Sequence, residues 1–226
     1  MGDNILYYMG IDIQVKKGCS FFIVDKQAET IDSGWVDETS HVETAKNLYK
    51  IAQDLTIDHK KIAIGIDAPR MPLKDKRSFY WDGKKGLWRK RRKKEKGYGR
   101  HCEVILKSVG IANPQWTRLE NECEDWMQCG FEIYNQFSEY RQVYEVFPSA
   151  SYNMLKEDRN VNVTINFSNF SQGPKDMVDA CIAAMTVYEF IHGRGTEVGD
   201  GDGLGSIILP RPLTDVINPE LLYWPS

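Results

Sequence analysis

The chain has 226 residues, of which 42% are hydrophobic and 27% are charged, and its formal net charge is −3 at pH 7. These values are typical of a globular protein, and the length favours one domain. No apolar run reaches the roughly 18 residues that span a bilayer, and no basic leader precedes an apolar segment, so we expect neither a membrane partner nor secretion. Five cysteines without a C-x-x-C pair suit free thiols in a reducing compartment. We therefore expect a cytosolic or nuclear protein and assign it to the cytoplasm.

Three short runs near the N-terminus predict antiparallel strands. They are rich in β-branched and aromatic residues and cover residues 5–13, 20–24 and 30–36. The first two are separated by Lys16-Lys17-Gly18, which predicts a hairpin turn because polar residues and glycine favour tight turns.

A helix and a buried strand follow these three strands. The capping-box pattern Thr39-Ser40-x-x-Glu43 marks the start of the helix, and apolar residues at spacings of three and four continue it to about Leu55. The next run, residues 61–67, is almost continuously apolar and ends at Ala68-Pro69. Such a run is typical of a parallel strand that is covered on both faces.

The rest of the chain predicts helices alternating with strands. The last helix opens with Pro174 and is apolar on most sides, so we expect it to pack deeply. Three antiparallel strands followed by helix-linked strands predict an α/β fold with a mixed five-stranded sheet and helices on both faces. A Pro-rich tail begins at about residue 210. The remaining elements are expected at residues 100–110 (helix), 119–140 (helix), 142–147 (strand), 174–192 (helix) and 207–209 (late strand).

The net charge hides one strongly basic segment. Residues 84–96 hold nine basic side chains and one acidic one, so they carry +8 while the other residues carry −11. Because a block of like charge repels itself, we expect a mobile loop, inserted at about residues 70–99. Nearby aromatic residues could stack on bases, so the segment suits RNA or DNA, although a nuclear-import signal or a solvated loop remains an alternative. The predicted nucleic-acid contacts are Arg70, Lys84, Lys85, Arg89, Lys90, Arg91, Arg92, Lys93, Lys94 and Arg100.

Five acidic residues fall where an ionised carboxylate is costly. Asp12 and Asp67 end predicted strands, Glu145 lies within a third, and Asp176 and Asp179 stand in the first turns of the last helix. A buried carboxylate needs a basic partner or a metal ion. Parallel strands end at one edge of a sheet, so the two strand-end acids should meet there. The i, i+3 spacing puts the two helical acids on one face.

Such a cluster of carboxylates predicts a divalent cation, because neighbouring acids raise each other's pKa. All-oxygen ligands favour Mg²⁺ or Mn²⁺ over zinc, and a pair of such ions can activate water for phosphodiester hydrolysis. Simpler explanations stay open for each acid alone. Asp179 could pair with a lysine, Asp12 could end a strand, and Asp176 could favour a helix N-terminus.

Five motifs occur together in one order along the chain. They are Met-Gly-Ile-Asp12, Ile-Gly-Ile-Asp67-Ala-Pro, Gly-Arg100-His-Cys-Glu103, Tyr-Glu145-Val-Phe-Pro and Lys-Asp176-Met-Val-Asp179-Ala. Over about residues 5–212 this order resembles the predicted nucleases of the domain of unknown function 429 (DUF429) family. That family is placed in the ribonuclease-H-like fold, with the Holliday-junction resolvases and retroviral integrases. The resemblance implies a single ribonuclease-H-like domain over residues 1–226 and a metal-dependent nuclease.

The resemblance also implies a catalytic role for each of the five acids. Asp12, Asp67 and Asp179 would bind the metal ion. Asp176 would be the accompanying acid one helical turn earlier, and Glu145 a family-specific acid nearby.

Other functions remain open at this point. The family pattern has histidine where this chain has Lys175, which removes a possible proton-transfer group and would suit a non-catalytic nucleic-acid binding module. An ATP-dependent phosphotransferase of the actin-like fold also places acids at strand ends, but such enzymes usually pair two of these domains. Arg70 and Arg100 could hold a phosphate, or pair with Asp67 and Glu103. The oligomeric state and the choice between RNA and DNA stay open.

Overall fold

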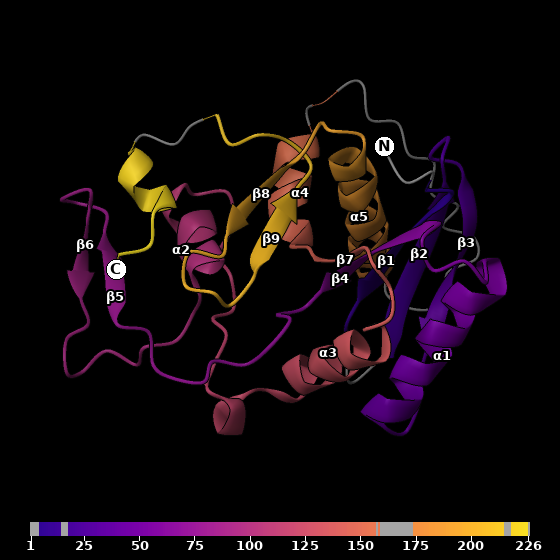
Figure 1. Cartoon of the computed structure of the whole chain (residues 1–226), viewed down its shortest axis with the longest axis horizontal. Helices are drawn as coiled ribbons and strands as arrows, with labels where there is room; N and C mark the ends of the chain where they lie inside the picture. The colour runs from indigo at the N-terminus through magenta and orange to yellow at the C-terminus, as the bar shows by residue number, and fades with distance from the viewer. Residues whose placement is uncertain (1–4, 15–17, 157, 159–173, 215–217, 226) are drawn as a thin grey trace.

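The structure, a computed structural model, describes residues 5–14, 18–156, 158, 174–214 and 218–225. At its centre β1 and β2 are antiparallel, β2 and β3 are antiparallel, and β4 and β7 run parallel to β1. The mixed five-stranded sheet predicted from the sequence is confirmed (Figure 1). Its strands, in spatial order, are β3 (Thr30–Val36), β2 (Cys19–Asp25), β1 (Tyr7–Asp12), β4 (Ile62–Asp67) and β7 (Val143–Glu145).

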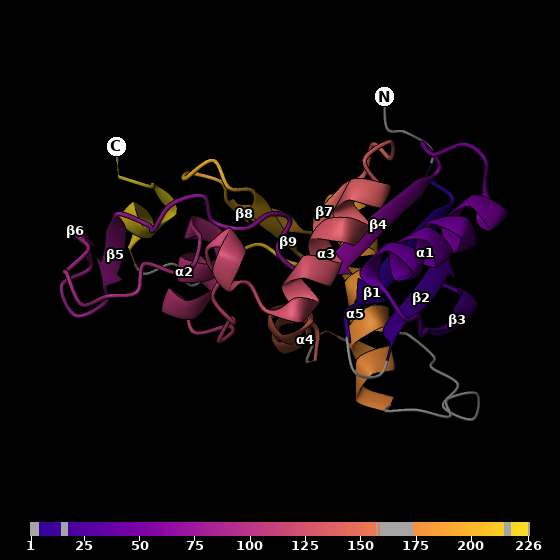
Figure 2. The same ribbon diagram turned by 90° about the horizontal axis from the view of Figure 1, so that it is seen from below.

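Helices cover both faces of this sheet, as expected. Helices α1 (His41–Leu55) and α3 (Asp125–Gln136) pack on one face, and α5 (Pro174–Ile191) packs on the other (Figure 2). Because side chains alternate along a strand, Ile66 of β4 belongs to the core under α1 and α3, while its neighbour Gly65 faces α5. The predicted start of α1 is also correct, since the Ser40 hydroxyl accepts a hydrogen bond from the backbone of residue 43.

Helix α5 approaches β1 and β4 closely because each strand carries a glycine at the contact. A Cβ atom at Gly10 would lie 2.0 Å from the carbonyl oxygen of Ala180, and one at Gly65 would lie 2.6 Å from an α5 side chain. No other residue leaves the room that these two positions require. Asp12 and Asp67 lie two residues further along their strands, so they belong to the same α5 face of the sheet.

A second group of elements packs beyond the β7 edge of the sheet. It consists of α2 (His101–Ser108), α4 (Pro148–Leu155), β8 (Thr196–Gly199) and β9 (Ser206–Leu209), which share an apolar cluster of their own. Figure 1 shows this group between the sheet and the opposite end of the molecule. The late strand predicted at residues 207–209 is present as β9, but it pairs with β8 and not with the central sheet.

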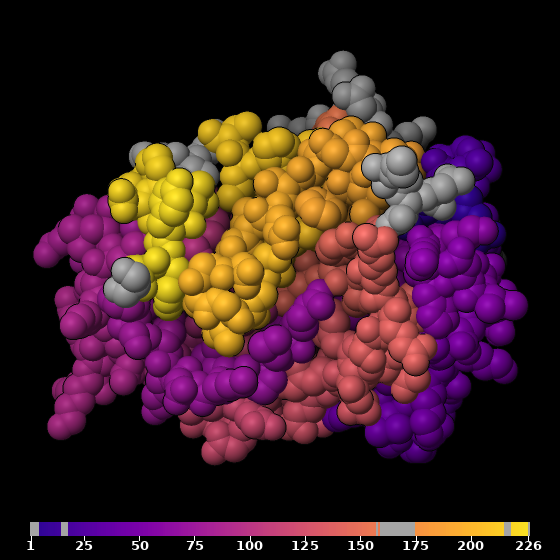
Figure 3. Space-filling view, in the orientation of Figure 1, coloured from indigo at the N-terminus to yellow at the C-terminus, as the bar shows by residue number. Residues whose placement is uncertain are grey.

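The insertion expected as a mobile loop contains an antiparallel hairpin of β5 (Phe79–Asp82) and β6 (Leu87–Lys90), so that expectation is wrong there. Aromatic packing offsets the charge repulsion. Trp81 and Trp88 are cross-strand partners with ring centroids 5.4 Å apart, and Trp88 also packs on Trp224 at 5.1 Å. The hairpin, at the left of Figure 3, forms one end of the molecular surface, and the C-terminal residues return to it.

Further details of the fold differ from the predictions made from the sequence, extend them or confirm them. The helix expected at 119–140 is divided into a short 3₁₀ helix, η1 (Glu120–Glu122), and α3, and the tail holds a second one, η3 (Pro219–Leu222). The expected turn residues Lys16 and Lys17 lie outside the described residues. All five cysteines are free, as predicted, and all five are buried. In the described part of the chain, every helix is too short or too polar to cross a membrane.

Candidate functional site

Four of the five acids predicted for the site lie together at the carboxyl ends of β1 and β4. Asp12 and Asp67 are register partners in the parallel pair and share the sheet face that α5 covers. The first turns of α5 bring Asp176 and Asp179 close enough for both of their charges to act on Asp12. Asp12 and Asp176 are buried, whereas the other two are partly exposed. The site therefore joins acids from three elements that are far apart in sequence.

Gln14 links the strand acids to the helix acids. Its side-chain amide donates to Asp12 Oδ2 at 3.2 Å and to Asp176 Oδ1 at 3.1 Å. The Ser20 hydroxyl of β2 also donates to the backbone oxygen of Asp176, at 2.9 Å. Gln14 was not predicted for this site, although the two-residue period of a strand places it on the same face as Asp12. These bonds fix the start of α5 against the end of β1.

The protonation of the two strand acids is strongly perturbed. The pKa of Asp12 is raised to about 7, chiefly by burial; the hydrogen bond from Gln14 opposes the rise, and the charges of Asp179 and Asp176 contribute to it. Burial likewise raises the pKa of Asp67 well above its usual value, and the Asp12 carboxyl adds to that rise through its charge and a hydrogen bond. Two such neighbours resist ionising together, so at neutral pH the pair needs a proton or an added cation.

The donor atoms of this site are all oxygens, which suits a hard divalent cation. Among the residues that the structure describes, no three acidic, histidine or cysteine side chains are arranged to hold a metal ion as they stand. Lys175 Nζ lies 2.6 Å from Asp179 Oδ2, and Gln14 bonds Asp12. A cation bound by both aspartates would therefore replace these contacts by a rotation of side chains.

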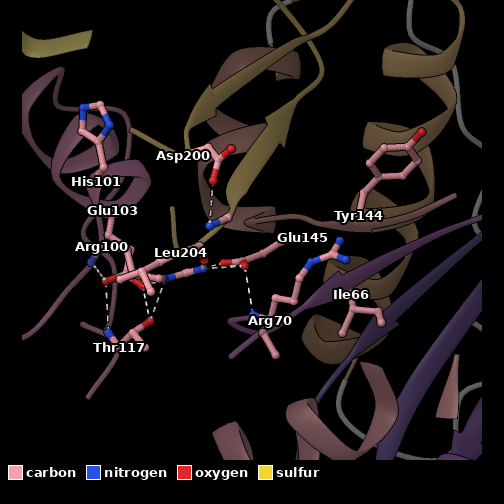
Figure 4. Close-up of polar contacts among 12 residues, drawn as sticks. Ile66, Arg70, Arg100, His101, Glu103, Thr117, Tyr144, Glu145, Asp200 and Leu204 are labelled. Atoms are coloured by element: carbon pink, nitrogen blue, oxygen red, sulfur yellow. Dashed lines mark hydrogen bonds and ion pairs between the residues drawn. The ribbon is translucent and has the colours of Figure 1, made fainter. Parts of the chain in front are cut away.

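Glu145 does not join this group. Its register partner in β4 is Ile66, which lies on the α1 and α3 side of the sheet. The side chain of Glu145 therefore leaves its strand on the face opposite to that of Asp67. It binds the guanidinium of Arg100, whose Nη1 donates to Glu145 Oε2 at 2.8 Å (Figure 4). The sequence left open whether all five acids converge. Glu145 pairs with Arg100 and not with the acids of α5, but its charge adds to the raised pKa of Asp67, and it accepts a hydrogen bond from the backbone N–H of Arg70 at 3.1 Å.

Arg100 lies at the centre of a buried ion cluster and is only 1% exposed. Its Nη2 also donates to Glu103 Oε1 at 2.9 Å, and the backbone N–H of Thr117 donates to Glu103 Oε2 at 3.0 Å (Figure 4). Although burial opposes its charge, the surrounding carboxylates hold the pKa of the Arg100 guanidinium well above its usual value. Arg100 is therefore not at the surface, where the sequence analysis expected it to contact a nucleic acid.

The other predicted phosphate contacts differ in their exposure and in whether a carboxylate already pairs with them. Arg70 is exposed, and its guanidinium lies 4.9 Å from the centre of the Tyr134 ring. Arg89 pairs with Glu95 across the end of the hairpin, and hydrogen bonding to Arg89 lowers the pKa of Glu95 to about 2. The predicted contacts that are exposed on the hairpin and the turn after it are Lys84, Lys85, Lys90, Arg91, Arg92, Lys93 and Lys94.

Comparisons with known proteins found no matching family model, no matching curated protein and no matching solved structure. The resemblance of the five motifs to the DUF429 family therefore stays a prediction.

Proposed function

We propose that this protein is a metal-dependent nuclease with a central sheet of the ribonuclease H type. The observation that carries the proposal is the Asp12 and Asp67 pair at the strand ends, which faces the acids of α5 and has strongly raised pKa values. Such a site keeps its charge only when a cation replaces the proton. Perturbed acids that are grouped in this way are typical of functional sites.

In this proposal Asp12, Asp67 and Asp179 hold Mg²⁺ or Mn²⁺, and Asp176 accompanies them. A bound divalent cation activates water and stabilises the charge that develops on the phosphate oxygens. Gln14 orients Asp12 and Asp176 by donating to both. The raised pKa of Asp12 means that the apoprotein holds a proton there, which leaves when the site is loaded.

The hairpin suggests the class of substrate. Its exposed lysines and arginines form a local excess of positive charge on a chain whose other residues are net negative. Phosphate backbones bind such surfaces through release of counterions. Nucleic acid therefore matches both the hairpin and the hydrolytic chemistry of a carboxylate site.

The test is a cleavage assay with labelled RNA, single- and double-stranded DNA and branched DNA in Mg²⁺ or Mn²⁺. We expect the wild-type protein to cleave at least one of these substrates, and Asp12→Asn to lose roughly 100-fold or more of the rate. Asp54→Asn makes the same change at an exposed position of α1 and should leave the rate unchanged. No cleavage of any substrate, or equal cleavage by Asp12→Asn, overturns the nuclease.

A non-catalytic nucleic-acid binding module is the second candidate, and one observation favours it. Lys175 already neutralises Asp179 at 2.6 Å, as a permanent ion pair would in a site that binds no metal ion. This candidate predicts binding that weakens steeply with salt, with a log–log slope of roughly −0.7 to −0.9 per neutralised phosphate, and no cleavage. Binding without cleavage, unaffected by divalent cations, would select it.

A further inference from the structure

A pocket of about 380 Å³ lies next to the hairpin, remote in sequence from the strand acids. Its volume is in the range of small-ligand sites. The three charged side chains that line it, Arg77, Lys96 and Lys107, are all cationic. Aromatic rings, including those of Tyr98 and Trp116, make up much of the remaining wall. A ligand for this pocket should therefore combine a flat apolar surface with negative charge.

Arg77 lines this pocket with a guanidinium whose hydrogen bonding is incomplete. Its guanidinium carbon lies 4.0 Å from the centre of the Tyr80 ring and 5.0 Å from that of Trp116. Its Nε and Nη1 atoms are shielded from solvent, and in the described part of the chain they have no hydrogen-bond partner. Unpaired buried donors of this kind cost free energy, and a bound acceptor could recover it only through a small shift of the Arg77 side chain, which lines the pocket. Burial also lowers the pKa of this guanidinium.

The walls of the pocket are held in place without a ligand. The backbone N–H of Arg77 donates to Gly97 O at 2.9 Å, and Gly97 N–H donates to the Tyr80 hydroxyl at 2.8 Å. Trp116 packs directly on Gly99, where a Cβ atom would lie 2.3 Å from the indole ring and the backbone φ is +90°. A preformed wall of this kind lowers the entropic cost of binding.

We propose that this pocket binds one nucleotide unit, with the base among the aromatic rings and the phosphate held by the cationic side chains. Aromatic rings and the flat guanidinium of arginine both stack on bases, and Lys96 and Lys107 would supply charge for a phosphate. Lys96 is also the last residue of the basic segment, so a strand whose phosphates follow the hairpin would reach the pocket directly. The inference rests on the proposed function for its ligand class but not on cleavage.

The nucleotide could come from two sources, a free mononucleotide or a base within a single strand. Binding is measured on the full chain carrying Asp12→Asn, in EDTA, so that the result is independent of cleavage. The probes are adenosine monophosphate, adenosine and inorganic phosphate by calorimetry, and a labelled single-stranded oligonucleotide by fluorescence anisotropy. Binding of the mononucleotide identifies a free nucleotide, and binding of the oligonucleotide alone identifies a strand.

Two variants test the pocket itself. Arg77→Met and Tyr98→Ala should each weaken binding roughly tenfold, through a lost charged hydrogen bond and a lost stacking surface. Lys50→Met removes one exposed cation from α1 and should leave binding unchanged. Arg77→Met should also leave thermal stability equal or higher, because it removes buried donors that have no partner. A residue with only a structural role would lower stability instead.

Any of three results would overturn the inference. One is wild-type binding by both Arg77→Met and Tyr98→Ala, and another is equal affinity for phosphate alone and for the nucleotide. If neither the mononucleotide nor the oligonucleotide binds, the pocket assignment is also wrong. A chain that binds but never cleaves keeps this inference and loses the nuclease. Cleavage by the wild-type protein, together with wild-type binding by both Arg77→Met and Tyr98→Ala, keeps the nuclease and loses this inference.

Discussion

Two groups of acids lie at the ends of neighbouring strands of one sheet, and they are stabilised in different ways. At the end of β7, Glu145 shares the guanidinium of Arg100 with Glu103, and this arginine is 1% exposed. At the ends of β1 and β4, Asp12 and Asp67 face further carboxylates, and burial raises the pKa of Asp12 to about 7. The first group carries its own cation, and the second relies on a proton or on an ion from solution.

Whether a group of acids has its own basic partner distinguishes a structural role from a chemical role better than the burial of the acids does. In the first group one guanidinium serves two carboxylates, and burial raises the pKa of Glu145, but hydrogen bonds from Arg100, Arg70 and Thr117 occupy the carboxylate oxygens and leave none of them for a ligand. A group of acids with an excess of negative charge exchanges protons near neutral pH and can exchange them for a metal ion. The following changes, three substitutions and the addition of a metal ion, are ordered by the size of the effect that we expect on the free energy of unfolding.

Arg100→Met should have the largest effect. It leaves Glu103 and Glu145 buried without their common cation, so we expect a loss of about 3–5 kcal/mol in the free energy of unfolding, measured with urea at pH 7. Lys50→Met, at an exposed position, should change it by less than about 0.5 kcal/mol. A loss below about 1 kcal/mol for Arg100→Met would show that the two acids are not neutralised by this arginine.

Asp12→Asn should stabilise the apoprotein at high pH. The raised pKa means that the folded state holds a proton that the unfolded state has released, so stability is full below about pH 4 and is lost as pH rises through about 7. Asparagine removes this loss, so urea unfolding in EDTA should show a gain on the order of 2 kcal/mol at pH 8 and little gain at pH 4. An Asp12→Asn protein that is less stable than wild type at pH 8 would contradict the assignment.

A divalent cation should stabilise the wild-type protein in a pH-dependent manner. At ten times its dissociation constant, Mn²⁺ adds about 1.4 kcal/mol, seen as a higher Tm at pH 8. The gain should be smaller at pH 5, where a proton occupies the Asp12 carboxyl. An equal rise in Tm at both pH values, or in Asp12→Asn, would place the ion elsewhere on the protein.

Lys175→Met should have the smallest effect on stability. The lysine side chain is 79% exposed in its pair with Asp179, so its loss should cost less than about 1 kcal/mol. Because the lysine competes with a metal ion for Asp179, the variant should bind Mn²⁺ up to about fivefold more tightly by calorimetry. Weaker binding would show that Lys175 supports the site and does not compete in it.

Hydrophobic pattern was sufficient to predict the central sheet and its covering helices. Strand β4 was recognisable because both of its faces are buried, and α1 because its apolar stripe follows a Ser40 cap. The positions of Asp12 and Asp67 at strand ends also predicted that they meet, since parallel strands end together. These features depend on local sequence and on one general rule of sheet geometry.

The features that were missed depend on contacts between distant segments. Glu145 was grouped with the other acids because its partner, Arg100, lies 45 residues earlier in the chain and is brought to it by the start of α2. The hairpin was missed because its charge was weighed above the Trp81 and Trp88 pair that holds it together. Helix α4 was missed because Pro148 was taken as the end of a strand, whereas proline also favours the first turn of a helix.

The two glycines under α5 restrict how the carboxylate site can open. At Gly10 and Gly65 the strands touch the helix without intervening side chains, so α5 cannot tilt away without exposing the core beneath it. The backbone amides of β1, β4 and the adjoining part of α5 should therefore exchange with deuterium only when the whole protein unfolds. The acids would then be reached by the rotation of Gln14 and Lys175, on the fast timescale of side chains, and not by the slower movement of a helix.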